Sequence, residues 1–387
     1  MLDSLHIKNF RCFEDLTIPS LGQVNLIVGK NNSGKSSFLD AIRVFASKGS
    51  MNTLNDILIS RDELVRSGED EEQDFLLSLT SLFYGRELPE EQDKGIMIGS
   101  ITNVKQRLKI DAIAYVEQFE VTEEEASGRT IRRRKRIPID EFQSLFPTLF
   151  PIDETSMEDV KIGIYVSYGD SRILIDSYYY RRPLLRKDAE KLETSHSYVP
   201  TKIVSPSEIA SLWDQVLFTP YEEEIKKSLA LIEENILDIG FIKSSKNSRD
   251  DRMAIVKIRN SQKPIPLKSM GEGISRLLQL FLYAFQAKSG FLLIDEFENG
   301  LHYSIQEEVW EKLFKLAKEL DIQVFATTHS EDTIKAFCKV SLADDEVDGK
   351  LISLGRSAAI ADNGKILADV YDEKTLAWIV QSGMEIR

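Results

Sequence analysis

The sequence predicts an α/β fold in which helices cover a parallel β-sheet. Three short apolar runs, at residues 24–28, 291–295 and 322–327, have the length and composition of buried strands. A segment with helical spacing of its apolar residues follows each of the first two. Buried strands that alternate with amphipathic helices indicate βαβ crossovers, and these crossovers build a parallel sheet.

Length and composition are those of an ordinary globular protein. The chain has 387 residues, of which 42% are hydrophobic and 29% are charged. A chain of this length forms two or three domains at ~100–200 residues each. The formal net charge is −14, which argues against a protein that coats nucleic acid with its whole surface but is compatible with a local basic strip.

Cysteine usage and the first residues predict the cellular compartment. The two cysteines, Cys12 and Cys338, lie far apart, which argues against a disulfide framework and against a zinc site. The N-terminus has no apolar signal core. No window reaches the ~18 uninterrupted apolar residues of a membrane span. We therefore expect a cytoplasmic protein with reduced thiols and no membrane contact.

The N-terminal segment predicts strands that lead into a helix. Residues 2–18 alternate apolar and polar side chains, as two short strands do. The run VNLIV at 24–28 ends at Gly29. From about Gly34 the apolar side chains follow helical spacing and fall on one face, which carries Phe38, Ala41, Ile42 and Phe45.

The region after this helix mixes charged segments with strands. Residues 61–94 are charge-rich and predict a solvated helix and loop. Residues 98–120 predict strands. Residues 121–136 change from acidic (EEEA) to basic (RRRKR), which predicts an exposed hairpin or a mobile loop. Residues 159–180 predict a hairpin with its turn at Gly169-Asp170.

Helices and strands alternate in the remainder of the chain. Residues 207–237 predict two helical pieces split by Pro220, the second with an apolar stripe of Ile225, Leu229, Ile232 and Ile236. A strand and a loop follow from residue 252. Further helices are expected at 274–286, 303–319 and 373–382, with two short strands after 350. No sustained heptad run is present, which argues against a long coiled-coil arm.

The strongest motif is a glycine-rich loop between a strand and a helix. GKNNSGKSS at 29–37 fits the pattern G-x4-G-K-[ST] of a phosphate-binding loop. Its glycines let backbone N–H groups approach phosphate oxygens at the positive end of the helix dipole. Lys35 is expected to reach the β- and γ-phosphates, and the Ser36 hydroxyl to ligate Mg²⁺. The expected nucleotide-binding residues are Gly29, Asn31, Asn32, Ser33, Gly34, Lys35, Ser36 and Ser37.

Two carboxylates end the second buried strand. In FLLIDEFENGLH at 291–302, Asp295 and Glu296 directly follow the apolar run. Burying a carboxylate there without a partner is costly, and a bound Mg²⁺ removes that cost. Asp295 is therefore expected to hold the metal, and Glu296 to orient and polarise the attacking water. The alternative is an acidic pair that faces solvent.

A histidine follows the third buried strand, in VFATTHS at 324–330. Parallel sheets place ligand-binding groups at the carboxyl ends of their strands. His329 is therefore expected to contact the γ-phosphate and to sense its loss. The alternative is a histidine whose hydrogen bonds serve only the fold.

A serine- and glycine-rich turn opens the helix that precedes the acidic strand. In LKSMGEGISRLL at 267–278, the backbone amides after Ser269 form a second helix start that suits an anion. Ordinary helix capping would use the same residue types. The functional interpretation of this turn therefore depends on its position shortly before Asp295.

The order of these motifs resembles the ABC-type ATPase heads of the SMC, RecF and OLD families. SMGE is similar to the ABC signature: Ser269, Gly271 and Glu272 match it, and Met270 stands where the family has a glycine. The resemblance implies that these three matching residues bind the nucleotide held by a second copy of the head.

Other residues carry the same resemblance. Asp295 and Glu296 match the Walker B motif, and His329 matches the switch histidine. The opening IKNFRCFED resembles the N-terminal strands of these families, which implies that Arg11 lies near the nucleotide. DEFENGLH and the final GMEIR are most similar to stand-alone OLD-like ATPases that lack a Toprim domain.

The resemblance implies an architecture and a mode of assembly. The fold expected is an ABC-type P-loop head with a parallel central sheet, N-terminal antiparallel strands and a mixed α+β insert. Residues 1–50 and 251–387 would form the head, and residues 51–250 the insert, a region for binding DNA or a partner and for dimerisation. Two heads would trap ATP and Mg²⁺ between them as a homodimer or a higher homo-oligomer, with Ser269 and Gly271 acting in trans.

Two features set the chain apart within this group. The interval from Lys35 to Ser269 is much longer than in ABC transporter subunits, which argues against a transporter. An OLD-type nuclease carries a Toprim domain with an acidic metal cluster after the histidine motif. The stretch after Ser330 is short, and ADDEVDG at 343–349 suits a solvated loop, so we expect no nuclease in this chain.

Three functions are compatible with these motifs. The first is an ATP-hydrolysing switch in DNA maintenance or anti-phage defence, which controls a separate effector such as a Toprim-type nuclease. The second is a DNA-binding repair clamp, in which Arg132–Arg136 and the run Arg181, Arg182, Arg186 and Lys187 beside Tyr178–Tyr180 contact DNA. A solvated loop that balances neighbouring acidic residues is the alternative for the basic runs. The third is a scaffold that binds ATP without hydrolysis, against which Glu296 argues.

Overall fold

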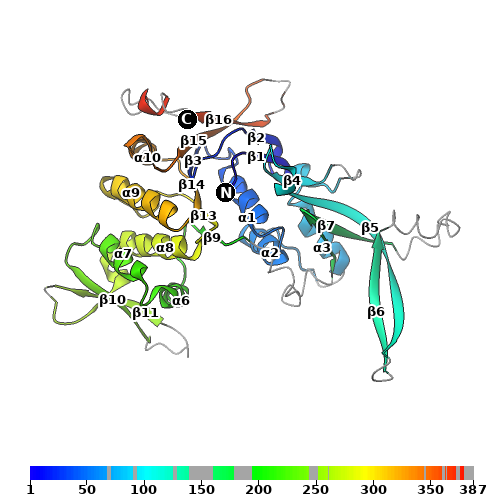
Figure 1. The fold of residues 1–387 in the computed structure, drawn as a ribbon, viewed down its shortest axis with the longest axis horizontal. Coiled ribbons are helices and arrows are strands. Elements are labelled where there is room, and N and C mark those ends of the chain that lie inside the picture. The colour runs from blue at the N-terminus through cyan, green and yellow to red at the C-terminus, as the bar shows by residue number, and fades with distance from the viewer. Residues whose placement is uncertain are drawn as a thin grey trace.

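Three sheets organise the chain in the computed structural model (Figure 1). The structure describes residues 1–67, 71–89, 94–124, 129–138, 160–177, 194–243, 252–259, 261–343, 346–359, 362, 364–371 and 375–378. The basic run near residue 181, the adjacent tyrosines and the terminal GMEIR lie outside these ranges.

The central sheet has the strand order β16-β15-β3-β14-β13-β9. Its strands are β3 (Val24–Val28), β9 (His196–Val199), β13 (Phe291–Ile294), β14 (Gln323–Thr327), β15 (Gly349–Arg356) and β16 (Ile366–Tyr371). Every neighbouring pair is parallel except β15 and β16. Strands β3, β13 and β14 are buried at every residue. The predicted parallel sheet of apolar strands is therefore confirmed.

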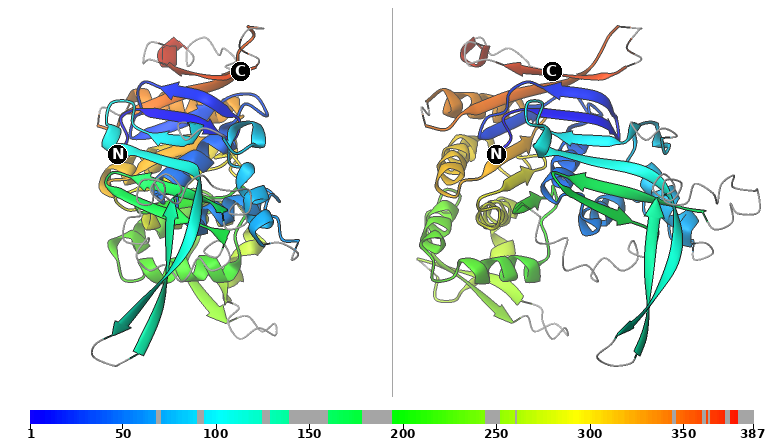
Figure 2. Two further views of the ribbon diagram at one scale, coloured as in Figure 1. Left: turned by 90° about the vertical axis from the view of Figure 1, so that its right-hand side faces the viewer. Right: turned by 45° about the vertical axis from the view of Figure 1, so that its right-hand side comes forward.

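The second sheet is antiparallel and contains the N-terminal strands. Its order is β2-β1-β4-β5-β7-β8, and β6 pairs with β5. The strands are β1 (Leu5–Phe10), β2 (Phe13–Ile18), β4 (Ile96–Gly99), β5 (Arg107–Glu124), β6 (Arg129–Pro138), β7 (Val160–Tyr168) and β8 (Ser171–Ile175). The predicted hairpin with a Gly169-Asp170 turn is confirmed, because Tyr168 pairs with Ser171. The β5–β6 hairpin extends away from the body of the molecule (Figures 1 and 2).

Helices fill the space on both faces of the central sheet. Helix α1 (Lys35–Ala46) lies between the two large sheets, where Phe38 and Ile42 share a core with Ile27 of β3 and Ile7 of β1. Gly34 is its N-cap residue, which agrees with the predicted start at about Gly34. Helices α2 (Met51–Ser60) and α3 (Glu71–Thr80) follow, with 3₁₀ turns at Tyr84–Arg86 and Val104–Gln106. The expectation of a solvated helix in 61–94 is wrong in one respect, because Phe75 of α3 is fully buried in this core.

The opposite face of the sheet carries the C-terminal helices. Helices α8 (Glu272–Gln286), α9 (Tyr303–Glu319) and α10 (Glu331–Ala343) cover it, and Leu26, Leu292 and Val324 point into their core. Helices α6 (Pro206–Val216) and α7 (Pro220–Leu229) pack on α8. The third sheet joins β10 (Ile236–Lys243), β11 (Arg252–Ile258) and β12 (Ile265–Pro266).

The predicted break at Pro220 is confirmed, but the length predicted for the second piece is wrong. Pro220 occupies the first turn of α7, where the missing N–H of proline costs nothing. The helix ends at Leu229, and Ile236 opens β10 instead of extending the helical stripe. Pairing of Ile236 with Ile258 of β11 overrides the local helical spacing.

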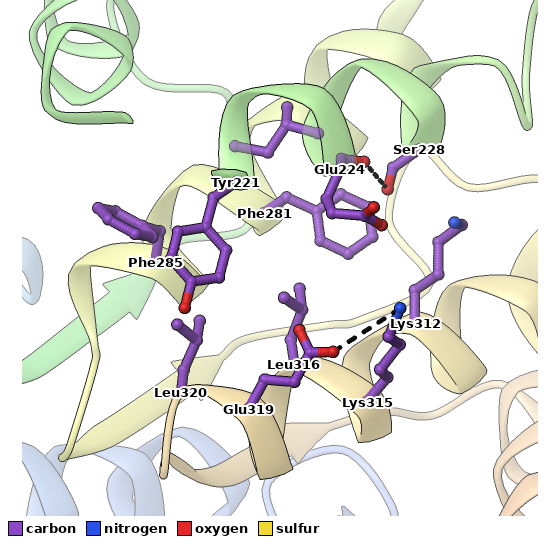
Figure 3. A pocket seen from close by; sticks show the side chains of 11 residues that line it. Tyr221, Glu224, Ser228, Phe281, Phe285, Lys312, Lys315, Leu316, Glu319 and Leu320 are labelled. Atoms are coloured by element: carbon purple, nitrogen blue, oxygen red, sulfur yellow. Dashed lines mark hydrogen bonds and ion pairs between the residues drawn. The ribbon is translucent and has the colours of Figure 1, made fainter. Parts of the chain in front are cut away.

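A small gap separates α7, α8 and α9 on this outer side (Figure 3). The rings of Tyr221 and Phe285 lie 4.8 Å apart across it, and Lys315 pairs with Glu319 at 3.7 Å. Its volume of about 50 Å³ is well below the ~300–1,000 Å³ of ligand pockets. This gap therefore belongs to helix packing.

The stretch 51–250 contributes to all three sheets, because β4–β8 extend the antiparallel sheet, β9 lies beside β13, and β10 opens the third sheet. The domain division at residues 50 and 251 stays a prediction. Of the helix expected at 373–382, residues 375–378 are described and helical, and the others lie outside the described ranges. Among the described helices, none is long and apolar enough to cross a membrane.

Candidate active site

The glycine-rich loop joins β3 to α1 in a conformation that depends on its glycines. Gly29 has φ 149° and Gly34 has φ 96°, values that side chains larger than glycine rarely adopt. A Cβ at Gly29 would lie 2.3 Å from the Leu354 carbonyl oxygen, and one at Gly34 would lie 2.9 Å from the Phe13 ring. Neighbouring strands therefore leave room for bare backbone only, which is what close approach to a phosphate requires.

Lys35 folds back over its own loop. Its Nζ donates to the carbonyl oxygens of Gly29 at 2.7 Å and Lys30 at 3.1 Å. Burial lowers the pKa of the Lys35 ammonium, while the carboxylates of Asp295 and Glu296 oppose that shift. Phosphate oxygens are stronger acceptors for an ammonium than carbonyls are, so a bound triphosphate would take over both hydrogen bonds.

The other loop residues surround this lysine. Asn31 and Asn32 are exposed, Asn32 with φ 62°, and Ser36 and Ser37 are half-buried in the first turn of α1. Ser33 is buried, and its Oγ has no hydrogen-bond partner among the described residues. A buried hydroxyl without a partner is costly, and a phosphate oxygen at this loop would satisfy it.

Asp295 ends β13 inside a set of hydroxyl donors. Its Oδ1 accepts a hydrogen bond from Thr327 at 2.8 Å, and its Oδ2 lies 3.3 Å from the Tyr198 hydroxyl and 3.5 Å from the Thr201 hydroxyl. Burial, followed by the Asp295 carboxylate, raises the pKa of Tyr198, so Tyr198 stays a neutral donor. The contacts to Oδ2 are long for O–H···O hydrogen bonds, which leaves this oxygen able to bind a cation.

Glu296 has a strained backbone. Its φ is 49°, in the left-handed region that glutamate rarely adopts, and such strain is commonly kept at functional sites. The Glu296 N–H donates to the Thr327 hydroxyl at 2.9 Å. The adjacent ring of Phe297 stacks on Trp310 of α9 with centroids 3.9 Å apart. The side chain of Glu296 is 41% exposed, so water can reach its carboxylate.

His329 follows β14 and faces two carboxylates. Its Nδ1 lies 3.9 Å from Glu296 and 3.2 Å from Glu298. The Glu298 carboxylate also accepts hydrogen bonds from the Thr328 hydroxyl at 2.7 Å and from the His329 N–H at 3.1 Å. Glu298 therefore fixes the histidine loop against the turn after β13. Glu298 is not among the residues predicted from the sequence, although its place as the third carboxylate of DEFE was a signal.

A pocket of about 420 Å³ lies between the glycine-rich loop and the histidine loop. Its walls come from both segments: Val28, Gly29, Lys30, Asn31, Thr328, His329, Glu331 and Ile334. The volume is in the range of small-molecule sites. The parallel register of β3, β14 and β13 brings together the loop, His329 and the two carboxylates at the carboxyl edge of the sheet.

Arg11 sits in the turn between β1 and β2, with φ 52°. Its guanidinium is nearly buried, 3.6 Å from Asp40 and 2.9 Å from Glu63. It lines a second pocket, of about 460 Å³, together with Ser37 and Arg61. Arg11 therefore lies beside the start of α1, and it is held by carboxylates of α1 and of the segment after α2.

The serine- and glycine-rich turn lies apart from these residues. A 3₁₀ turn at Leu267–Met270 precedes Gly271, whose φ of 98° opens α8. Ser269, Gly271 and Glu272 are exposed. Within the described ranges, they make no hydrogen bond or ion pair with the glycine-rich loop. The structure thus groups the glycine-rich loop, Asp295, Glu296 and His329 at one sheet edge, places Arg11 beside the start of α1, and leaves this turn exposed to solvent.

Comparison with known proteins identifies relatives of this arrangement. The family described as AAA ATPase domain matches residues 1–334. The ATP/GTP phosphatase of Helicobacter pylori is 24% identical over 357 residues, which are 88% of either chain. The crystal structure of an SMC head bound to the C-winged helix domain of ScpA has a TM-score of 0.50 at 15% identity, and the match covers 97% of this chain and 99% of that one. The predicted SMC-like α/β fold is confirmed.

Two further matches cover short stretches of the chain. The DNA replication and repair protein RecF of Ligilactobacillus salivarius is 37% identical over 71 residues, 18% of this chain and 19% of that protein. The OLD nuclease of Thermus scotoductus is 52% identical over 42 residues, 11% of this chain and 8% of that protein. The resemblance to the SMC, RecF and OLD group is confirmed.

Proposed function

Since the chain belongs to the AAA ATPase domain family and is an ATP-binding, ATP-hydrolysing enzyme related to RecF and OLD proteins, we propose that it works as a molecular switch. Two copies would close around ATP and separate after hydrolysis. The observation that carries this proposal is that Ser269, Gly271 and Glu272 are exposed and, within the described ranges, make no hydrogen bond or ion pair with the loop that holds Lys35. A second copy would bring the two together.

Lys35, Ser33 and the loop amides would hold the triphosphate. Ser36 and Asp295 would fit a Mg²⁺ ion, because a hydroxyl and a carboxylate whose Oδ2 accepts only long hydrogen bonds, together with phosphate oxygens, form the donor set that Mg²⁺ prefers. When bound, Mg²⁺ neutralises charge on the β- and γ-phosphates. Arg11 and Ser37 border the second pocket, which adjoins the start of α1 and suits the rest of the nucleotide.

Glu296 would orient the attacking water and accept its proton. Its exposed carboxylate stands 3.9 Å from Nδ1 of His329, and His329 lines the pocket beside the glycine-rich loop. His329 would contact the γ-phosphate, and Glu298 keeps its ring in place. Loss of the γ-phosphate after hydrolysis removes the group that both sides of the closed pair bind, and the heads separate.

Ser269, Gly271 and Glu272 would bind the nucleotide of the partner copy. Gly271 has a positive φ of 98°, which favours glycine, and no atom lies within 4 Å of a Cβ placed there. The surface around this turn is therefore open to a partner. Met270, where the family has a glycine, would lie at that interface.

We place the switch in DNA maintenance or anti-phage defence, where it would control a separate effector such as a Toprim-type nuclease. The support comes from the short matches to a DNA replication and repair protein and to an OLD nuclease. Residues 1–50 and 251–387 would form the ATPase head, and residues 51–250 would carry the surface for DNA or the effector.

The second candidate is a DNA clamp, and the projecting β5–β6 hairpin favours it (Figure 1). Arg132–Arg136 lie on β6. The register places Arg136 opposite Glu117 and Arg133 opposite Glu120.

Measurement of molecular mass by light scattering tests the switch. We expect a mass of two copies with ATP under conditions in which hydrolysis is slow. With ADP or without nucleotide we expect a mass of one copy. Turnover per head should rise with protein concentration, because a pair is the active unit. One copy under all conditions would contradict the switch. Duplex DNA binding with a steep salt dependence, lost on Arg132–Arg136→Ala, would instead support the clamp.

A further inference from the structure

Arg276 is a charged side chain buried in the helix that begins at the exposed turn. It lies one turn into α8 and is only 2% exposed. No ion pair joins it to a carboxylate within the described ranges. Its guanidinium donates instead to backbone carbonyl oxygens, which are those of Asp295 at 2.9 Å, Glu296 at 3.2 Å and Pro200.

Such an arrangement is costly to maintain. A buried guanidinium loses its hydration, and this burial lowers the pKa of Arg276, while the nearby carboxylates, Asp295 first, favour its charged form. An apolar side chain of similar size would fill the space without that cost. The position of the three carbonyls gives a reason for an arginine here.

The two carbonyls from the turn after β13 flank one strained residue. The Asp295 carbonyl precedes the Glu296 Cα and the Glu296 carbonyl follows it, and both accept from Nη2 of Arg276. The φ of Glu296 between them is 49°. Arg276, together with the Thr327 hydroxyl on the Glu296 N–H, therefore holds both peptide groups that set the direction of the Glu296 side chain.

The third carbonyl ties in another segment of the site. Pro200 follows β9, and the next residue, Thr201, approaches Asp295 with its hydroxyl and binds the Asn299 side chain with its carbonyl at 2.7 Å. One guanidinium thus joins α8 to the segments that follow β9 and β13. Movement of the first turn of α8 would therefore shift the backbone of Asp295 and Glu296 together.

We propose that Arg276 is a positioning residue that keeps Glu296 aimed at the attacking water and couples this aim to the exposed turn at Ser269–Glu272. The inference rests on the proposed function, because a partner that docks on that turn shifts the start of α8. Closure of the pair would then reach the carboxylate of the same head through Arg276. ATP binding by the glycine-rich loop does not involve Arg276.

Variants of Arg276 are tested against a matched control on the same helix. Gln279 is fully buried on α8 and also contacts the segment after β9, with Nε2 donating to the Lys202 carbonyl at 3.4 Å, but no hydrogen bond or ion pair joins it to the described turn after β13. Arg276→Met removes the guanidinium, Arg276→Lys keeps the charge with one nitrogen, and Gln279→Met is the control. Kd for ATP, kcat, Tm and ATP-dependent mass are measured for each full-length protein.

We expect Arg276→Met to lower kcat by roughly a hundredfold with little change in the Kd for ATP, as small misplacements of catalytic groups do. Arg276→Lys should recover part of this loss. Gln279→Met should keep the wild-type kcat even where its Tm falls as much as that of Arg276→Met. The double variant Arg276→Met with Glu296→Gln should be no slower than Glu296→Gln alone, because both changes act through one carboxylate.

Three results would overturn the inference: a loss in Gln279→Met equal to that in Arg276→Met, a loss that appears in the Kd for ATP, or a further loss in the double variant. If Arg276→Met does not fold, Arg276→Lys decides by the same comparison. The mass measurement reports separately on the proposed pair. If wild type and Arg276→Met each form pairs with ATP and only wild type turns ATP over fast, both the proposed pair and the role of Arg276 are supported.

Discussion

Lys35→Ala removes ATP binding and turnover together. Without this ammonium, the triphosphate would face Asp295, Glu296 and Glu298, the carboxylates that act on Lys35. Removing one partner of a desolvated charge pair costs about 3 kcal/mol or more, which is roughly a hundredfold in the Kd for ATP. Isothermal titration with ATP and Mg²⁺ measures this loss directly, and a phosphate-release assay measures turnover.

Lys48→Ala is the matched control for this change. Lys48 lies just beyond the other end of α1, its Nζ stands over the rings of Tyr168 at 3.9 Å and Phe45 at 4.4 Å, and burial lowers its pKa to about 8. It is a second partly buried lysine far from the glycine-rich loop. ATP affinity should survive its loss. ATP binding by Lys35→Ala within threefold of wild type would show that the loop does not hold the phosphates.

Glu296→Gln keeps ATP binding and stops turnover. Glutamine has the same shape but cannot accept the proton of the attacking water, so kcat should fall by about 10²–10⁴-fold. Removing one negative charge beside the γ-phosphate leaves ATP bound at least as tightly. The pair should then persist with ATP, which light scattering measures as a stable mass of two copies.

The neighbouring Glu298→Gln separates two roles of the acidic turn. Glu298 contacts the histidine loop through Thr328 and His329, so its replacement should slow turnover by less than about tenfold, as loss of one hydrogen-bonded support does. Wild-type turnover in Glu296→Gln would contradict the role proposed for Glu296. Equal losses in both variants would mean that the carboxylates act as one unit.

The core of the fold and most of the site could be predicted from the sequence because their signals are local. The composition of apolar runs such as Val24–Val28 and Phe291–Ile294 is enough to predict that they are buried strands. The glycine-rich loop and the carboxylates after β13 lie at strand ends, where the sequence changes character abruptly. Functional residues at such positions can be recognised from the sequence without knowledge of their contacts.

The rest depends on contacts between distant segments. Nothing near His196–Val199 indicates that β9 lies beside β13, yet this pairing brings Tyr198 to Asp295. Arg276 resembles any polar residue of an amphipathic helix until its carbonyl partners are known. Ile236 shows the converse error, in which local helical spacing lost to pairing with β11. Tertiary pairing of this kind overrides local preference.

A mixing experiment tests the central claim that each site is shared between two copies. Glu296→Gln has an intact exposed turn, and Ser269→Arg has an intact Glu296 but a blocked turn, so each alone should be inactive. When equal amounts are mixed before ATP is added, about half of the pairs contain one copy of each variant, and each mixed pair has one intact site of two. We predict recovered turnover, up to about a quarter of the wild-type rate per head. A mixture no faster than its two components measured separately would contradict the shared site.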